Sequence, residues 1–152
     1  MPGRLSWPST PWREICSWVL SQDSYDLSRF VFTGLLSPAA LAELLAITDL
    51  HVYLTVPFVL SWSLLDAMAC GATVLASDTA PVREVIRHGE NGLLIDFFDV
   101  EGFAAAAIRV LDAPDEFRRL GQAGCDLVRE RYSLQACMPR LMALYEDAAY
   151  AP

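Results

Sequence analysis

The chain has 152 residues, enough for one domain that buries about two thirds of the surface exposed by its unfolded form. Hydrophobic residues make up 54% of the sequence and charged residues 20%, which excludes intrinsic disorder and favours a buried sheet covered by helices. The net charge is −8, with eleven arginines and no lysine. This balance argues against a broad basic surface, so we expect no nucleic-acid partner.

The sequence also indicates where the protein is located and whether its cysteines are free. Residues 1–11 are rich in proline and serine and have no apolar stretch, which predicts an irregular segment and no signal peptide. The most apolar window, residues 50–65, contains Pro57 and is shorter than the roughly 20 residues that span a bilayer. The four cysteines are widely spaced, which favours free structural thiols. We therefore expect a cytoplasmic protein without a transmembrane segment.

The first third of the chain predicts an alternation of helices and strands. Residues 12–20 fit a short helix, and residues 30–33 fit a short strand that ends at a glycine. Ser37 followed by Pro38 is typical of a helix start, because the serine oxygen accepts a free N–H and proline fits the first turn. Residues 51–55 then predict a second strand.

The next segment predicts a helix, a glycine stop and a buried strand. The helix covers residues 61–70, with Ser61 as a candidate N-cap, and Gly71 is free to adopt the left-handed conformation that ends helices. Residues 73–76 predict a third strand. Residues 81–88 fit a short helix, and residues 92–95 fit a fourth strand after an Asn-Gly turn. Three further helices are expected at residues 99–111, at residues 114–131 and from Ser133 onwards.

Strands joined by crossover helices must be parallel, so the predicted fold is three-layer α/β, Rossmann-like, with about four strands. Ligands of such sheets bind outside the carboxyl ends of the strands, near helix N-termini that favour anions. Loops 55–62 and 77–82 follow two of the strands, and the hydroxyls of Ser61, Ser63 and Thr79 suit a phosphate. Neither loop carries a Walker or Rossmann glycine pattern, so a pure capping role for Ser61 stays open.

Four segments carry a resemblance to a known family. They are FVFTGLLSPAALAELLAITDLHVYLT, SLLDAMACGATVLASD, REVIRHGENGLLIDFFD and RYSLQACMPRLMALYEDA. In order and spacing they resemble the C-terminal half of the family 4 glycosyltransferases of the GT-B fold, over about four fifths of the chain. The resemblance implies a nucleotide-sugar donor site. In that site a helix carboxylate, here Asp66, holds the donor ribose, and amides at the helix start face the diphosphate.

The sequence departs from this family at the implied donor site. A second glutamate, separated by seven residues from the ribose-binding one, is replaced by Phe58, and Ser61 stands where a loop glycine is usual. Aspartate at position 66 reaches about 1 Å less far than glutamate. We therefore expect donor binding to survive better than transfer. The candidate donor-binding residues are Phe58, Ser61, Trp62, Ser63, Asp66, Thr79 and Ala80, with Thr79–Ala80 at the place of paired glycines.

Several side chains in or near this region have two interpretations. Trp62 fits either stacking on a base or sugar or packing at the helix start. Arg83 and Arg87 fit solvated surface residues better than phosphate contacts, and His51 and His88 fit structural positions better than catalytic ones. The family's basic pair, which stabilises the leaving diphosphate, lies upstream of the matched region, so no catalytic residue is assigned. We expect no metal and no cofactor, with the nucleotide-sugar as substrate.

The resemblance also implies that the chain, 1–152, is a single and incomplete domain. GT-B enzymes use two domains, and two strands that lie in the middle of the family's sheet, with order 3-2-1-4-5-6, have no counterpart here. A separate N-terminal half is therefore one expected partner, and the full-length enzyme would contact membranes peripherally. The alternative function is a non-catalytic interaction module that forms homo-oligomers through an exposed sheet edge.

Overall fold

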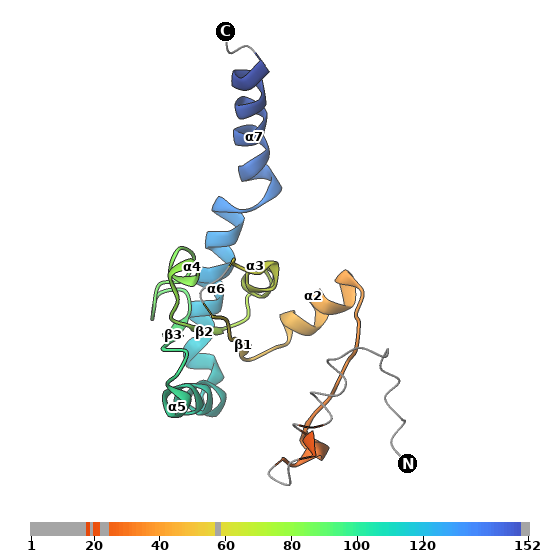
Figure 1. Ribbon diagram of the computed structural model, residues 1–152, viewed down its shortest axis with the longest axis vertical. Helices are drawn as coiled ribbons and strands as arrows, with labels where there is room; N and C mark the ends of the chain where they lie inside the picture. The colour runs from red at the N-terminus through yellow and green to blue at the C-terminus, as the bar shows by residue number, and fades with distance from the viewer. Residues whose placement is uncertain (1–17, 19, 22–24, 57–58, 150–152) are drawn as a thin grey trace. The chain divides into compact units, whose positions relative to one another are not determined.

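The computed structural model describes residues 18, 20–21, 25–56 and 59–149, which fall into two compact units, Met1–Pro38 and Ala39–Pro152. The expected irregular segment 1–11 and most of the expected helix 12–20 lie outside the described residues. Within that helix, Trp18 and Leu20 are helical. The ribbon in Figure 1 shows the elements in chain order.

In the first unit, the expected strand at residues 30–33 does not form. A 3-10 helix, η1 (Leu27–Arg29), precedes this segment, and the Asp26 carboxylate caps it by accepting the Ser28 N–H at 3.1 Å. Phe30 is extended but stacks on Phe32 in the same segment, with 6.1 Å between ring centroids. No described strand pairs with residues 30–33. Without a neighbour to take its backbone hydrogen bonds, an extended segment is not a strand, so the prediction was wrong.

The second unit holds a parallel sheet of three strands, where about four were expected. Their order is β1-β2-β3, with His51 opposite Val74 and Leu75 opposite Leu93. The helix α2 (Pro38–Ala46) begins at the last residue of the first unit. The other strands and helices of the second unit are β1 (His51–Tyr53), α3 (Trp62–Ala69), β2 (Val74–Ser77), α4 (Ala80–Arg83), β3 (Leu93–Ile95), α5 (Val100–Asp112), α6 (Pro114–Arg131) and α7 (Leu134–Ala149).

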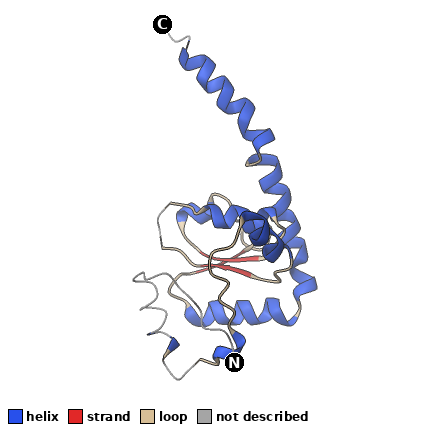
Figure 2. Cartoon of the chain, turned by 90° about the vertical axis from the view of Figure 1, so that its right-hand side faces the viewer, coloured by secondary structure: helices blue, strands red, loops and turns tan. Residues whose placement is uncertain are grey.

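Helices cover both faces of the sheet, as Figure 2 shows, so the three-layer α/β arrangement is confirmed. Side chains of a strand alternate between faces. Val74 and Ala76 of β2 accordingly pack with α3 residues in one cluster, while Leu75 packs with α5 and α6 residues in a second cluster. β2 is buried along its whole length, as expected of a central strand between two helical layers.

The expected helix 61–70 is confirmed as α3. Ser61 is its N-cap, and Gly71 follows with a φ of +79°, the left-handed conformation predicted for the stop. The helix expected at residues 81–88 is shorter, because α4 ends at Arg83. The Asn91 side chain donates to the carbonyl of Val85 at 3.0 Å and accepts the Arg87 N–H at 2.7 Å. These bonds satisfy backbone groups that a longer helix would pair internally.

The three C-terminal helices form where the sequence predicts them. The Asp99 carboxylate caps α5 by accepting the Gly102 N–H at 2.8 Å, and Pro114 opens α6. Ser133 caps α7 through the Ala136 N–H at 3.2 Å. α7 contains Pro139 and buries none of its described residues. Within the described part of the chain, no helix combines the length and apolarity needed to cross a bilayer.

Candidate functional site

Two loops meet at the carboxyl ends of the parallel strands. The backbone N–H of Thr55, just after β1, donates to the hydroxyl of Ser77 at the end of β2, at 2.9 Å. The N–H of Asp78 donates to the carbonyl of Ile95 at the end of β3, at 2.7 Å. These bonds fix the chain where all three strands end, and both loops predicted from the sequence leave the sheet at this edge.

The start of α3 is fixed to the sheet by a tyrosine. Tyr53, the last residue of β1, is buried, and its hydroxyl accepts the Ser61 N–H at 2.9 Å. Ser61 Oγ accepts the Ser63 N–H at 3.3 Å and lies 3.0 Å from Ser63 Oγ. The capping role of Ser61 is thus confirmed. A phosphate contact by the same residues stays a prediction.

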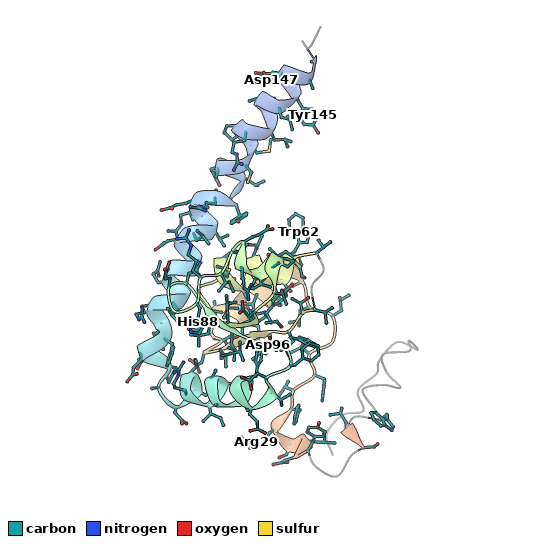
Figure 3. All side chains as sticks on the ribbon, turned by 60° about the vertical axis from the view of Figure 1, so that its left-hand side comes forward. Arg29, Trp62, His88, Asp96, Tyr145 and Asp147 are labelled. Carbon is teal, nitrogen blue, oxygen red and sulfur yellow. The ribbon has the colours of Figure 1, made fainter. Side chains whose placement is uncertain are left out.

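The exposed face of α3 carries Trp62 and Asp66, four residues apart and therefore neighbours on the helix surface. Trp62 is 83% exposed, so it is not packed against the described residues, and Figure 3 shows its side chain at the start of α3. Asp66 is exposed, and no ion pair between described residues involves it. The opposite face buries Leu64, Ala67 and Met68.

The second loop carries an ion pair and a buried hydroxyl. Both Arg83 donors Nε and Nη2 bind the Asp78 carboxylate, at 2.5 Å and 2.7 Å. The Arg83 side chain is 61% exposed, which agrees with the expected surface position, and it forms an ion pair with Asp78. Its guanidinium holds the pKa of the Asp78 carboxyl below its usual range. Thr79 is 6% exposed, its hydroxyl has no hydrogen-bond partner among the described residues, and Ala80 is exposed.

The remaining candidates have structural surroundings or lie outside the described residues. Phe58 lies outside them. Arg87 is exposed and lies 3.7 Å from Glu90, a surface ion pair one helical turn apart. His88 Nδ1 accepts the Leu94 N–H at 3.0 Å, and burial lowers the pKa of His51. These contacts agree with the structural interpretation of both histidines.

Tyr53 and Ser77, whose hydroxyls fix the two loops, are not among the site residues predicted from the sequence. Ser77 is the first residue of the expected loop 77–82, and Tyr53 lies within the expected strand 51–55. Alternation along β1 does place Tyr53 on the same face as Val74 and Ala76. The direction of its hydroxyl, however, depends on where α3 lies, and no local pattern encodes that position.

The geometry combines three chemical features on one helix. The helix dipole at the start of α3 and two serine hydroxyls favour an anion, although the Ser61 and Ser63 N–H groups already donate to Tyr53 and Ser61. One turn further, the Asp66 carboxylate is an acceptor for paired hydroxyls. Trp62 adds an exposed aromatic surface next to it. A ligand with an anionic group, a vicinal diol and a planar ring matches this arrangement.

The family model for Glycosyl transferases group 1 matches residues 12–113. N-acetyl-alpha-D-glucosaminyl L-malate synthase of Bacillus anthracis is 32% identical over 106 residues, which cover 70% of this chain and 28% of that protein. MMP alpha-(1->4)-mannosyltransferase of Mycolicibacterium hassiacum is 34% identical over 110 residues, which cover 72% of this chain and 25% of that protein.

Solved structures agree with the fold. Sucrose-phosphate synthase from Thermosynechococcus elongatus superposes with a TM-score of 0.82 at 26% identity, over 92% of this chain and 35% of that one. HepE of Anabaena, solved in complex with UDP, superposes with a TM-score of 0.73 at 19% identity, over 90% of this chain and 35% of that one. This second match shows the fold alone.

Both sets of matches also show what share of each relative's length this chain covers. The chain spans between a quarter and about a third of the length of these relatives. The neighbours are GT-B glycosyltransferases, and the parallel α/β sheet with flanking helices is the fold that the sequence predicted. The chain therefore belongs to the group 1 glycosyl transferases.

Proposed function

We propose that the chain binds the nucleoside diphosphate part of a nucleotide-sugar and forms the donor-binding part of a glycosyltransferase. The observation that carries the proposal is the position of α3. Its N-terminus is held at the carboxyl ends of the strands by the Tyr53 hydroxyl, and its exposed face carries Asp66. Open parallel sheets bind nucleotides at this edge.

In the proposed complex each part of α3 has one task. The diphosphate faces the start of α3 and the hydroxyls of Ser61 and Ser63, where the helix dipole favours negative charge. The ribose hydroxyls donate to the Asp66 carboxylate, and the exposed indole of Trp62 lies beside the nucleoside. The site needs no metal, because the helix N-terminus supplies the positive potential. The buried Thr79 hydroxyl and Ala80 line the second loop behind the diphosphate.

The proposal covers binding of the donor more directly than transfer of the sugar. The resemblance implies an acceptor site in the other domain of GT-B enzymes, and Phe58 replaces a carboxylate implicated at the transferred hexose. We therefore propose that glycosyl transfer requires a partner that supplies the remaining half. The relatives' names indicate different sugars and acceptors, so the donor's nucleotide is the part to test first.

Isothermal titration of the chain with UDP, GDP and ADP tests the proposal. We expect one nucleotide to bind, and Asp66→Ala to weaken its affinity about 10- to 100-fold, because hydrogen bonds to a charged acceptor are lost. Asp66→Glu restores the family's side chain and should bind at least as tightly as wild type. EDTA should leave the affinity unchanged.

Asp112→Ala is the matched control. Asp112 is exposed at the end of α5, a helix of the other layer, and its substitution changes the net charge by the same amount. We expect it to bind nucleotide as wild type does. Absence of binding for all three nucleotides, or an equal loss of affinity in both alanine variants, would contradict the proposal.

A second candidate function is an interaction module, and the free edge of β1 favours it. Among the described strands, β1 pairs with β2 alone. Val52 is 46% exposed, and Leu54 and Val56 beyond it are 59% and 52% exposed. An apolar strand with an unpaired edge is a template for pairing with another chain.

A further inference from the structure

The C-terminal end of α3 lies unusually close to α6. A Cβ added at Gly121 would overlap the carbonyl oxygen of Gly71, and one added at Gly124 would lie 3.3 Å from Met68 Cε and 3.7 Å from Met68 Cβ. Two glycines one turn apart on α6 thus allow its backbone to approach α3 more closely than any larger residue would. Cys125 follows Gly124 directly and belongs to the same contact between α6 and the end of α3.

Because α6 lies close to α3 here, Cys125 contacts the C-terminal end of α3. Its thiol donates to the carbonyl oxygen of Ala69 at 3.2 Å, and the next residue, Cys70, is the C-cap of α3. Cys70 is half-buried and packs against the hydrophobic cluster that includes Met68. Cys125 is half-buried too, so both sulfurs are within reach of small reagents from solvent.

The electrostatics of Cys70 agree with a close approach of the two sulfurs. The pKa of the Cys70 thiol is raised, first by burial, then by the Asp66 carboxylate, and then by Cys125 itself. The Cys125 sulfur also accepts a hydrogen bond from Arg129 Nη2 at 3.6 Å. The same guanidinium pairs with the Asp126 carboxylate at 2.9 Å. Because a raised pKa lowers the thiolate fraction of Cys70, the first attack is assigned to Cys125.

We propose that Cys70 and Cys125 are a redox-active pair that closes to a disulfide between α3 and α6. With oxidised glutathione as the oxidant, the Cys125 thiolate attacks one glutathione sulfur and releases one reduced glutathione. The Cys70 thiolate then attacks the Cys125 sulfur of this mixed disulfide and releases the second. The protein loses two protons and two electrons, and the oxidant gains them as two thiols.

Formation of the disulfide has a measurable effect on stability, because Cys70 and Cys125 are distant in sequence. The bond closes a loop of roughly 55 residues, which restricts the unfolded chain and raises the melting temperature by about 5–15 °C. It also fixes the last turn of α3, one turn beyond Asp66, whose backbone carbonyl accepts the Cys70 N–H at 3.1 Å. The inference itself does not depend on nucleotide binding.

The full chain with Cys16→Ser and Cys137→Ser, which keeps only the pair, tests the inference. It is incubated in reduced and oxidised glutathione, free thiols are alkylated, and a non-reducing digest is read by mass spectrometry. We expect a peptide linking Cys70 to Cys125 and a rise in melting temperature that dithiothreitol reverses. Each sample serves as its own folding control, since only its redox state changes.

The matched control adds Cys70→Ser to the same background. It should stop at the mixed disulfide of Cys125 with glutathione and show no rise in melting temperature. Absence of the linked peptide in oxidised glutathione would overturn the inference, and so would an equal rise in melting temperature in the Cys70→Ser control. UDP affinity, measured separately, reports on the proposed function alone.

Discussion

At the scale of single residues, polar side chains position the candidate site. The buried Ser77 accepts the Thr55 N–H, and the buried Tyr53 accepts the Ser61 N–H, so each loop has a hydrogen bond to a strand end. Satisfying a backbone N–H in this way avoids the cost of burying it unpaired. Both hydroxyls therefore restrict the loops at the point where the proposed ligand binds.

Burial of His51 gives the protein a pH dependence that can be measured. Burial lowers the pKa of His51 below its ordinary value of 6.5. Between the two pKa values the unfolded chain binds a proton that the folded chain does not. This group therefore leaves the free energy of unfolding unchanged above about pH 6.5. Below that pH the free energy of unfolding falls until the lowered pKa is reached, by at most about 1.4 kcal/mol per pH unit.

Urea unfolding between pH 7 and pH 5 checks this expectation. The difference in unfolding free energy between wild type and His51→Gln should shrink as the pH falls. In wild type, unfolding allows His51 to bind a proton, which favours the unfolded state, and His51→Gln has no such group. His88→Gln keeps His51 and should retain the wild-type slope. A wild-type slope in His51→Gln would show that another group is responsible. The lowered pKa of Asp78 acts at lower pH, below that carboxyl's usual value of 3.8.

At the scale of elements, the contact between α3 and α6 joins two segments that are far apart in sequence. Gly121 and Gly124 are both buried on α6, although glycine in a helix interior costs about 0.5–1 kcal/mol relative to alanine. Both glycines lie where the backbones of the two elements meet. Packing, more than helix propensity, explains these positions.

Substitution of the two glycines by alanine should give graded effects. Gly121→Ala forces Cβ onto the Gly71 carbonyl oxygen and should lower the free energy of unfolding by about 1–3 kcal/mol despite the better helix propensity. Gly124→Ala meets the flexible end of Met68 at 3.3 Å and the Asn91 carbonyl oxygen at the same distance, and should cost less. Urea denaturation of both variants measures the order. A stabilising Gly121→Ala would show that the helices separate easily.

At the scale of the whole molecule, the free edge of β1 allows an experiment that distinguishes the two candidate functions. The His51 N–H donates to the Thr73 carbonyl oxygen next to β2 at 2.8 Å. Because backbone groups alternate in direction along a strand, the Val52 N–H points to the free edge. Proline at position 52 therefore removes a donor from that edge and leaves the hydrogen bonds to β2 intact.

Light scattering across a range of protein concentrations provides the test. An interaction module should dimerise as the concentration rises, and Val52→Pro should abolish the dimer while the circular dichroism spectrum stays the same. Val100→Pro, at the first position of α5 where proline is tolerated, is the matched control and should leave the dimer unchanged. A wild-type monomer at every concentration contradicts pairing through β1 and leaves donor binding as the function.

The sequence alone determined the α/β class, the family and most helix limits, because these depend on local signals. Ser61, Gly71, Asp99 and Pro114 mark helix ends through contacts within a few residues, and the structure has helix ends at all four. Asp66 could be assigned from a motif, because the family's helix carries its carboxylate at a fixed spacing. Its role in binding stays a prediction.

Only the tertiary structure decided which extended segments are strands and which polar groups meet. Residues 30–33 have a strand-like sequence but no described partner, while β1 and β3 become strands by pairing with β2. The Tyr53, Ser77 and Cys125 contacts likewise join residues that are 8, 22 and 56 positions apart. Hydrogen bonds between distant segments depend on how helices and strands pack, and a local pattern does not specify that packing.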